Sequence, residues 1–138
     1  MKIGAVITAR STSSRYPRKH LGRLGGITMI EQIIKKLEYL KNLDHIILST
    51  TTNTSDNELC RIAYEAGAEI SRGPEHDLLV RDLHAIETFN LGAVVTISGD
   101  CPFVSNEYVQ VLIDGLLAEA HQSIPEHTHY LQTDNPLI

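Results

Sequence analysis

Short apolar runs alternate with amphipathic segments along this chain of 138 residues, and no other feature of the sequence limits the fold as strongly. Each run has the character of a buried strand, and each following segment carries apolar residues at helical spacing. Strands are predicted at residues 3–7, 45–50, 68–71 and 93–97. Because such alternation builds right-handed βαβ units, we predict a single domain over residues 1–138 with a three-layer, Rossmann-like α/β fold and a mostly parallel sheet.

Capping motifs indicate where the first two helices begin. Thr28 opens a T-x-x-E capping box in front of a helix predicted over residues 29–41. Ser55 and Glu58 form a second such box, and the helix after it is predicted to end at Gly67 in a left-handed cap. Cys60 falls on the apolar side of this second helix, where a buried, reduced thiol is the expected role.

The last two helices are defined by their apolar stripes. The third is predicted to end near Gly92 and to face the core with Leu79, Leu83, Ile86 and Phe89. Ser105 is predicted to cap a long final helix. Its stripe comprises Tyr108, Val109, Leu112, Ile113, Leu116, Leu117 and Ala120. We interpret this stripe as core rather than as a partner groove, and expect a further short strand at residues 128–131.

A cationic loop follows the first predicted strand. Between Ala9 and Gly26 there are five basic residues and no acidic one. Arginine forks and a lysine charge beside hydroxyl groups suit an anion with several oxygens, and a polyphosphate is the commonest such ligand. A charge run of this kind is often only solvated surface. The position favours a ligand site, because open α/β sheets bind ligands beyond the carboxyl ends of their strands.

The charge distribution is uneven. Residues 1–41 hold nine of the 12 basic and two of the 17 acidic residues, a net charge of +7, and the remainder carries −12. A positive loop facing an acidic remainder suits a metal–nucleotide site better than a nucleic-acid surface, and no apolar run is long enough to span a membrane. Without a secretory signal at the N-terminus, we expect a cytoplasmic protein that binds neither nucleic acid nor membrane.

Asp100 is a lone carboxylate in the loop after the fourth predicted strand, between Gly99 and Cys101. A carboxylate that faces a phosphate-binding loop is a natural Mg²⁺ ligand, because that ion is typically held by one or two carboxylates, phosphate oxygens and water. In isolation, a Gly-Asp pair more often belongs to a turn in which the aspartate bonds its own backbone. Its place after a strand favours the Mg²⁺ site.

Four motifs occur in order along the chain: I-x-A-R-x-x-S-x-R-x-P-x-K-x-L, T-T-N, R-G-x-x-x-D-[VL]-L-x-R and G-D-C-P. The matching residues are Ile7, Ala9, Arg10, Ser13, Arg15, Pro17, Lys19 and Leu21, then Thr51, Thr52 and Asn53, then Arg72, Gly73, Asp77, Leu78, Leu79 and Arg81, and finally Gly99, Asp100, Cys101 and Pro102. With these motifs, over about residues 3–120, the chain resembles the cytidylyltransferases that make CMP-activated acidic sugars, most closely the spore-coat polysaccharide branch.

The resemblance implies a nucleotide-diphospho-sugar transferase fold and Mg²⁺-dependent transfer of CMP from CTP to an acidic sugar, with release of pyrophosphate. Arg10, Ser13, Arg15 and Lys19 would hold the triphosphate beside Ala9 and Gly99. Asp100 would bind Mg²⁺ and form the catalytic centre with Arg15 and Lys19. Arg72, Asp77 and Arg81 would lie near the base or ribose. Such chemistry needs positioning and charge neutralisation rather than a protein nucleophile.

Two alternatives stay open. The family's second metal carboxylate, acceptor-sugar pocket and dimerisation segment normally lie in a C-terminal half that follows the matched region. The chain is therefore either an enzyme, for which a homodimer is one option, or a truncated homologue that binds nucleotide or a partner subunit without turnover. Phosphate-binding residues also do not distinguish one nucleotide base from another, so a nucleoside triphosphate other than CTP is an option. Three late histidines, His121, His127 and His129, are interpreted as exposed rather than as zinc ligands.

Overall fold

The computed structural model describes residues 1–10, 23–24, 27–99, 105–120 and 129–133 of the chain. Its main sheet has five strands in the order β5-β4-β1-β6-β7, and every neighbouring pair is parallel. The strands are β1 (Ile3–Thr8), β4 (His45–Thr51), β5 (Glu69–Gly73), β6 (Ala93–Ser98) and β7 (His129–Thr133). The predicted parallel α/β sheet is confirmed, and the fifth strand is the one expected near residues 128–131.

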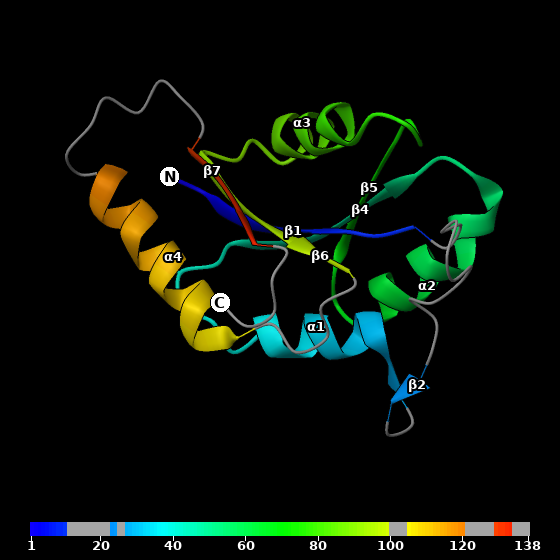
Figure 1. The fold of residues 1–138 in the computed structure, drawn as a ribbon, viewed down its shortest axis with the longest axis horizontal. Coiled ribbons are helices and arrows are strands. Elements are labelled where there is room, and N and C mark those ends of the chain that lie inside the picture. Colours follow the sequence, from blue (N-terminus) through cyan, green and yellow to red (C-terminus); the bar gives the residue numbers. More distant parts are fainter. Residues whose placement is uncertain (11–22, 25–26, 100–104, 121–128, 134–138) are drawn as a thin grey trace.

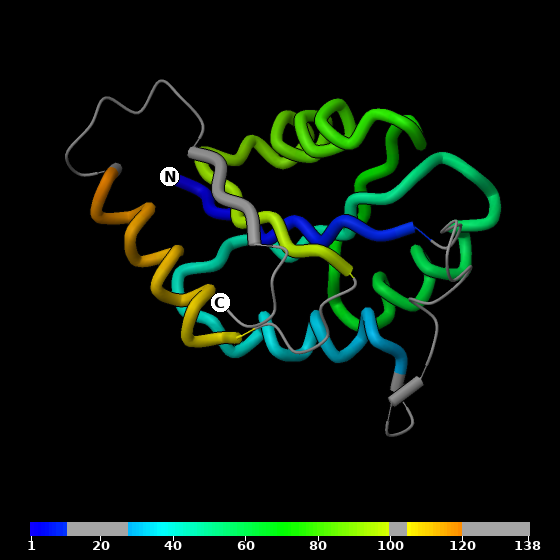
Figure 2. Tube along the Cα trace, in the orientation of Figure 1, coloured from blue at the N-terminus to red at the C-terminus, as the bar shows by residue number. Residues whose placement is uncertain are grey.

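In the described part of the chain, four α-helices cover the two faces of this sheet unequally (Figure 1). They are α1 (Met29–Leu37), α2 (Asn57–Glu65), α3 (Leu78–Thr88) and α4 (Asn106–Ala120). One core cluster joins α1, α2 and α4 to one face of the sheet, and a smaller cluster joins α3 to the other. The three-layer arrangement is therefore as predicted, and the tube in Figure 2 shows β1 running through the middle of it.

The larger core cluster contains the stripes that the sequence indicated. From the first helix it takes Ile30, Ile33, Ile34 and Leu37, and from the last it takes Val109, Ile113 and Leu116. Leu112 and Leu117 pack partly buried against it, so the final stripe is core as predicted. None of the described helices is long and apolar enough to cross a membrane.

Three of the predicted helix caps are confirmed. The Thr28 Oγ1 accepts from the Glu31 amide at 3.2 Å, and the Glu31 carboxylate accepts from the Thr28 amide at 3.3 Å, which completes the capping box. Gly67 has a φ of +109°, the left-handed conformation expected after α2. The Ser105 hydroxyl accepts from the Tyr108 amide at 3.2 Å in front of α4. However, α1 ends at Leu37, four residues before the predicted end, and α3 ends at Thr88 rather than near Gly92.

The predicted capping box at Ser55 is wrong. Thr54–Asp56 form a 3-10 helix, η2, and α2 begins only at Asn57. Asp56 stands at the N-cap position without a side-chain cap bond, because its carboxylate instead accepts from the Thr51 hydroxyl at the end of β4. A short hairpin of β2 (Arg23–Leu24) and β3 (Ile27–Thr28), which the sequence analysis did not expect, precedes α1.

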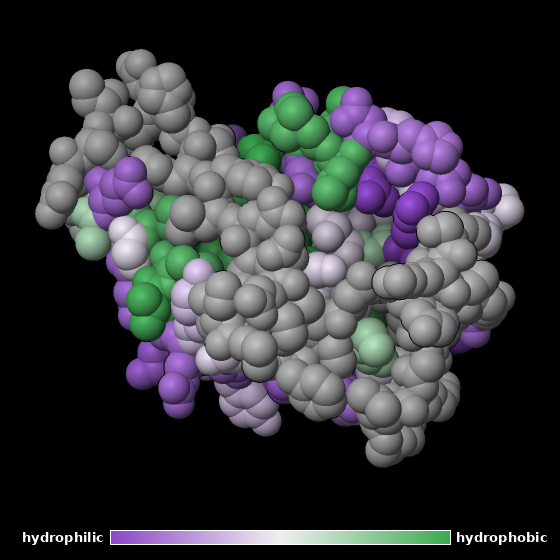
Figure 3. All heavy atoms as spheres, in the orientation of Figure 1, coloured by the Kyte–Doolittle hydropathy of each residue, from purple (hydrophilic) through white to green (hydrophobic). Residues whose placement is uncertain are grey.

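The predicted inward face of α3 is also largely wrong. Leu79 and Leu83 are 63% and 45% exposed, whereas Arg81, Asp82, Ala85 and Ile86 are buried. Ile86 faces the core as predicted, and Phe89 is partly buried after the helix ends. The exposed apolar side chains form a green patch over α3 in Figure 3, and they are Leu78, Leu79, Val80 and Leu83.

Gly73 explains how α3 approaches β5 so closely. A Cβ at this position would lie 2.9 Å from Cγ and 3.3 Å from Cα of Arg81. The missing side chain thus lets the first turns of α3 lie against the end of β5, with Arg81 turned inward. The glycine of the R-G motif is therefore required for packing in this fold.

We predict that Gly73→Ala lowers the free energy of unfolding by about 1–3 kcal/mol, because the added methyl group forces the α3 backbone away from the sheet. Gly115→Ala is the matched control. A Cβ there meets nothing within 4 Å, so the same substitution inside α4 should raise stability by about 0.5–1 kcal/mol. Urea denaturation of both variants checks this, and a Gly73→Ala protein as stable as the wild type would refute the packing argument.

Candidate active site

The ends of β1 and β6 bring two of the sequence motifs together. The strands are paired in register from Ile3 with Ala93 to Thr8 with Ser98. The Gly99 amide then donates to the Thr8 carbonyl at 2.9 Å, so the A-R and G-D motifs leave the sheet side by side. On the other side, the Ala9 amide donates to the Ser49 carbonyl of β4 at 3.2 Å. The strand ends that lead into the two loops are therefore neighbours at the carboxyl edge, while most of each loop lies outside the described residues.

Several predicted site residues lie outside the described residues. They are Ser13, Arg15 and Lys19 of the cationic loop and Asp100 of the G-D-C-P loop. Their roles therefore remain predictions. Of the histidines considered for zinc, His121 and His127 also lie outside the described residues. Among the described residues, no group of three or more histidine, cysteine, aspartate or glutamate side chains could hold a metal ion.

Arg10 extends from the end of β1 toward the loop between β5 and α3. Its Nη1 lies 3.4 Å from Oε1 of Glu75, and the two side chains are 39% and 28% exposed. The other carboxylate oxygen of Glu75 accepts from Nδ2 of Asn53 at 3.2 Å. Glu75 thus links the A-R motif of the first loop to the T-T-N motif after β4.

Arg72 holds the loop after β4 with its whole guanidinium group. Nε donates to the Thr51 carbonyl at 2.6 Å, and Nη2 donates to the Asn53 carbonyl at 2.7 Å. Nη1 donates to Oδ1 of Asn57 at 2.9 Å, at the start of α2. Arg72 was predicted to lie near the base or ribose. In the structure two of its nitrogens bind the T-T-N loop and the third binds the start of α2, which is a positioning role.

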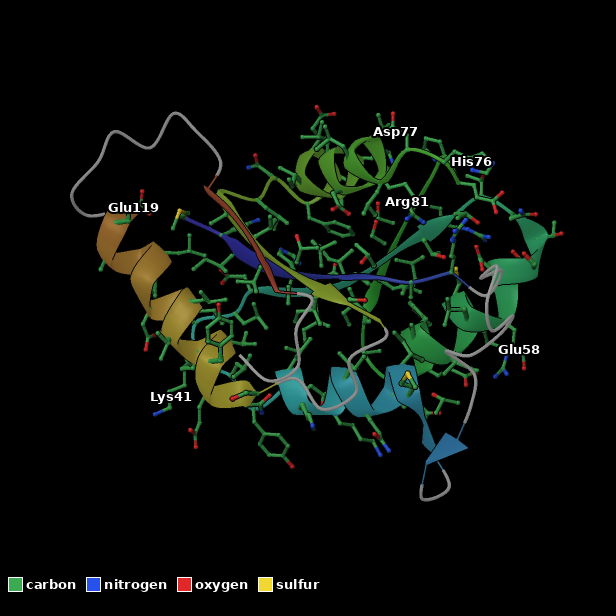
Figure 4. All side chains as sticks on the ribbon, in the orientation of Figure 1. Lys41, Glu58, His76, Asp77, Arg81 and Glu119 are labelled. Atoms are coloured by element: carbon green, nitrogen blue, oxygen red, sulfur yellow. The ribbon has the colours of Figure 1, made fainter. Side chains whose placement is uncertain are left out.

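Asp77 directly precedes α3 and Arg81 lies on its first turn (Figure 4). The Asp77 carboxylate accepts from the Val80 amide at 3.1 Å and is the N-cap of the helix. Arg81 is only 6% exposed, and its Nε and Nη1 are buried without a hydrogen-bond partner among the described residues. A buried guanidinium with unused donors is costly, so these atoms are available to an acceptor that enters the site.

Two buried carboxylates accompany Arg81. Asp82 is 1% exposed and accepts from the Ser49 hydroxyl at 3.4 Å, and Asp56 is fully buried against Thr51. Burial lowers the pKa of Arg81 below its ordinary value. The charge of Asp82 raises this pKa again, Arg10 lowers it, and Asp56 and Glu75 raise it. Attraction to the carboxylates thus offsets part of the cost of burying the guanidinium, which stays charged at neutral pH.

Sequence reasoning missed Asp56, Asp82 and Glu75. Asp56 was hidden because the predicted helix start at Ser55 placed it inside a helix, and Asp82 because the apolar stripe of α3 was assigned to another face. The sequence did contain one indication of this face. Arg81 and Asp82 precede Ala85 and Ile86 by one helical turn, so the four residues lie on the same side of α3.

Cys60 lies on α2 and is half-buried against the larger core cluster. Burial raises the pKa of its thiol, and Asp56 raises it further, while Arg72 lowers it. The net effect keeps the thiol protonated and weakly reactive at neutral pH. The predicted reduced cysteine on the core side of the helix is consistent with this environment.

The parallel sheet, with its charged loops gathered at the carboxyl edge, defines an open α/β domain of the kind that holds a ligand at that edge. The chain belongs to the cytidylyltransferase family, whose profile matches residues 5–136. It is 34% identical over 117 residues to an uncharacterized protein of Methanocaldococcus jannaschii, covering 85% of this chain and 48% of that protein. It is 29% identical over 112 residues to the spore coat polysaccharide biosynthesis protein SpsF of Bacillus subtilis. That match covers 78% of this chain and 47% of SpsF.

Solved structures agree with this membership. A cytidylyltransferase from Leptospira borgpetersenii superposes with a TM-score of 0.82 at 30% identity, covering 87% of this chain and 50% of that one. A CMP:2-keto-3-deoxy-manno-octonic acid synthetase, solved in complex with CTP, superposes with a TM-score of 0.76 at 19% identity. The superposition covers 86% of this chain and 48% of that one, and it supports the fold. The chain spans about half the length of the curated relatives it matches.

We predict that Arg72→Lys lowers the free energy of unfolding by about 1–2 kcal/mol, because one ammonium group cannot replace a fork that binds two carbonyls and an amide. The backbone amides of residues 52–57 should also exchange faster with deuterium. Arg61→Lys is the control, since Arg61 is 57% exposed and pairs with Glu65 on the surface of α2, where less than about 0.5 kcal/mol is expected. Equal effects of the two substitutions would contradict the positioning role.

Proposed function

We propose that this protein binds CTP with Mg²⁺ and transfers CMP to an acidic sugar with release of pyrophosphate, in the synthesis of a surface polysaccharide. One observation carries the proposal: β1 and β6 are neighbours, so the A-R and G-D motifs emerge together at the carboxyl edge of the sheet. Among the relatives, SpsF is named for spore coat polysaccharide biosynthesis, and the octonic acid synthetase was solved with CTP. These names support the class of nucleotide and acceptor.

In this proposal the charged residues divide between binding and positioning. Arg10, Ser13, Arg15 and Lys19 hold the triphosphate, beside the backbone of Ala9 and Gly99. The buried Arg81 offers its unused donors to the nucleotide base or ribose, and Asp77 holds the α3 terminus nearby. Arg72 acts on the nucleotide indirectly, by fixing the T-T-N loop.

Asp100 would hold the Mg²⁺ ion. It directly follows Gly99, whose backbone is fixed against Thr8 at the edge where the phosphates are expected. A single carboxylate fits Mg²⁺ when phosphate oxygens and water complete the coordination. When bound, the ion neutralises charge that develops on the transferred phosphoryl group. Arg15 and Lys19 would contribute the same electrostatic stabilisation from the protein side.

The alternative is a non-catalytic homologue that binds nucleotide or a partner subunit. The chain spans about half the length of the curated relatives it matches, so the catalytic activity of those whole proteins is part of the proposal for this chain. Nucleotide binding without pyrophosphate release in the presence of acidic sugars would favour this alternative.

Calorimetric titration with CTP, UTP, GTP and ATP, with and without Mg²⁺, tests the proposal. CTP should bind selectively, and Lys19→Ala should weaken it about 10- to 100-fold, since a hydrogen bond to a charged group is worth about 1.5–3 kcal/mol. Asp100→Ala should abolish the dependence on Mg²⁺. Lys35→Ala, which removes an exposed lysine from the last turn of α1, is the control and should change nothing. No nucleotide binding at millimolar concentration would refute the proposal.

A further inference from the structure

Arg10, which the proposed function assigns to the triphosphate, already has an anionic neighbour in this chain. Oε1 of Glu75 lies 3.4 Å from its Nη1. The contact is single rather than the bidentate pairing that makes arginine–carboxylate pairs strong. Both side chains are also partly exposed, at 39% and 28%. The pair is therefore weak and open to solvent, and an incoming anion can reach it.

The carboxylate of Glu75 is held in this place by the loops around it. Its second oxygen accepts from Nδ2 of Asn53 at 3.2 Å. The Asn53 carbonyl is in turn fixed by Nη2 of Arg72 at 2.7 Å. Pro74 directly precedes Glu75 and restricts the backbone between β5 and α3. The motifs after β4 and β5 together present one negative charge to the arginine at the end of β1.

A carboxylate and a phosphate compete for the same guanidinium donors, and they repel each other when both are charged. We propose that Glu75 is an affinity-setting residue that occupies Arg10 as an internal anion in the nucleotide-free protein and gives it up to a phosphate group of the nucleotide. This inference rests on the proposed binding of a nucleotide triphosphate at the loop after β1. Ligands with little charge cannot displace Glu75, so the contact favours polyphosphates.

The strength of the pair sets the size of the effect. Because the pair is partly exposed, Glu75→Gln should tighten CTP and pyrophosphate binding about two- to fivefold, which corresponds to about 0.4–1 kcal/mol. Cytidine, which carries no phosphate, should bind the variant and the wild type equally. The isosteric amide keeps the size of the side chain, and circular dichroism with urea denaturation verifies that the variant is folded.

Two controls separate this contact from a general change of charge. Glu87→Gln removes the same charge from an exposed site at the other end of α3, about 15 Å along the helix from Asp77. It should leave pyrophosphate affinity unchanged. In an Arg10→Ala background, Glu75→Gln should give no gain, because the arginine that it releases is absent. Calorimetric titration of the single and double variants with CTP, pyrophosphate and cytidine makes these measurements.

The outcomes distinguish this inference from the proposed function. If the wild type binds CTP and Glu75→Gln weakens or does not change binding, Glu75 orients Arg10 or is neutral, and the inference is overturned while the proposed function stands. An equal gain in the Arg10→Ala background overturns it as well. Labelling of Arg10 with phenylglyoxal tests the ion pair separately, because Arg10 should react faster in Glu75→Gln than in the wild type. If neither protein binds CTP or pyrophosphate, both proposals fail, whatever the labelling shows.

Discussion

The parallel pairing of β1 on both of its edges is the constraint on which the rest of the structure depends. Its residues are in register with β4 on one side and β6 on the other, so Thr8 lies opposite Ser49 and Ser98. Three chain segments far apart in sequence therefore leave the sheet at one edge. A parallel ladder fixes this meeting through backbone hydrogen bonds alone, whatever side chains the loops carry. The loops can thus vary in chemistry while their starting points stay fixed.

The face of α3 that lies on the sheet combines charged and apolar side chains. Ala85 and Ile86 pack against the strands, and Arg81 and Asp82 are buried one turn earlier on the same face. The Asp82 carboxylate accepts from the Ser49 hydroxyl, and Arg81 lies against Gly73. Turning Leu79 and Leu83 inward would bury more apolar surface, but it would break these contacts and carry Ala85 and Ile86 out of the core.

The family motifs acquire separate physical roles in this structure. The R-G pair joins a guanidinium that fixes the T-T-N loop to a glycine that lets α3 approach β5. The aspartate of the same motif caps α3, and its final arginine is buried beside two carboxylates. Residues that look like a row of ligand contacts in the sequence are thus partly a scaffold. In the proposed function, a scaffold of this kind holds the nucleotide-binding edge in place and so lowers the entropy lost when the nucleotide binds.

The sequence alone determined the order of the main strands and helices along the chain, the layers and most helix caps, because these follow from local period and from the geometry of parallel βαβ units. It also indicated that β1 and β6 end at the same edge of the sheet. The left-handed Gly67 and the capping box at Thr28 were predictable for the same local reason. Only the tertiary structure decided that α3 buries Arg81 and Asp82, and that Arg72 and Glu75 bind neighbouring loops. Such contacts depend on the rotation of a helix and on distances between segments, and the local pattern of apolar residues carries no information about either.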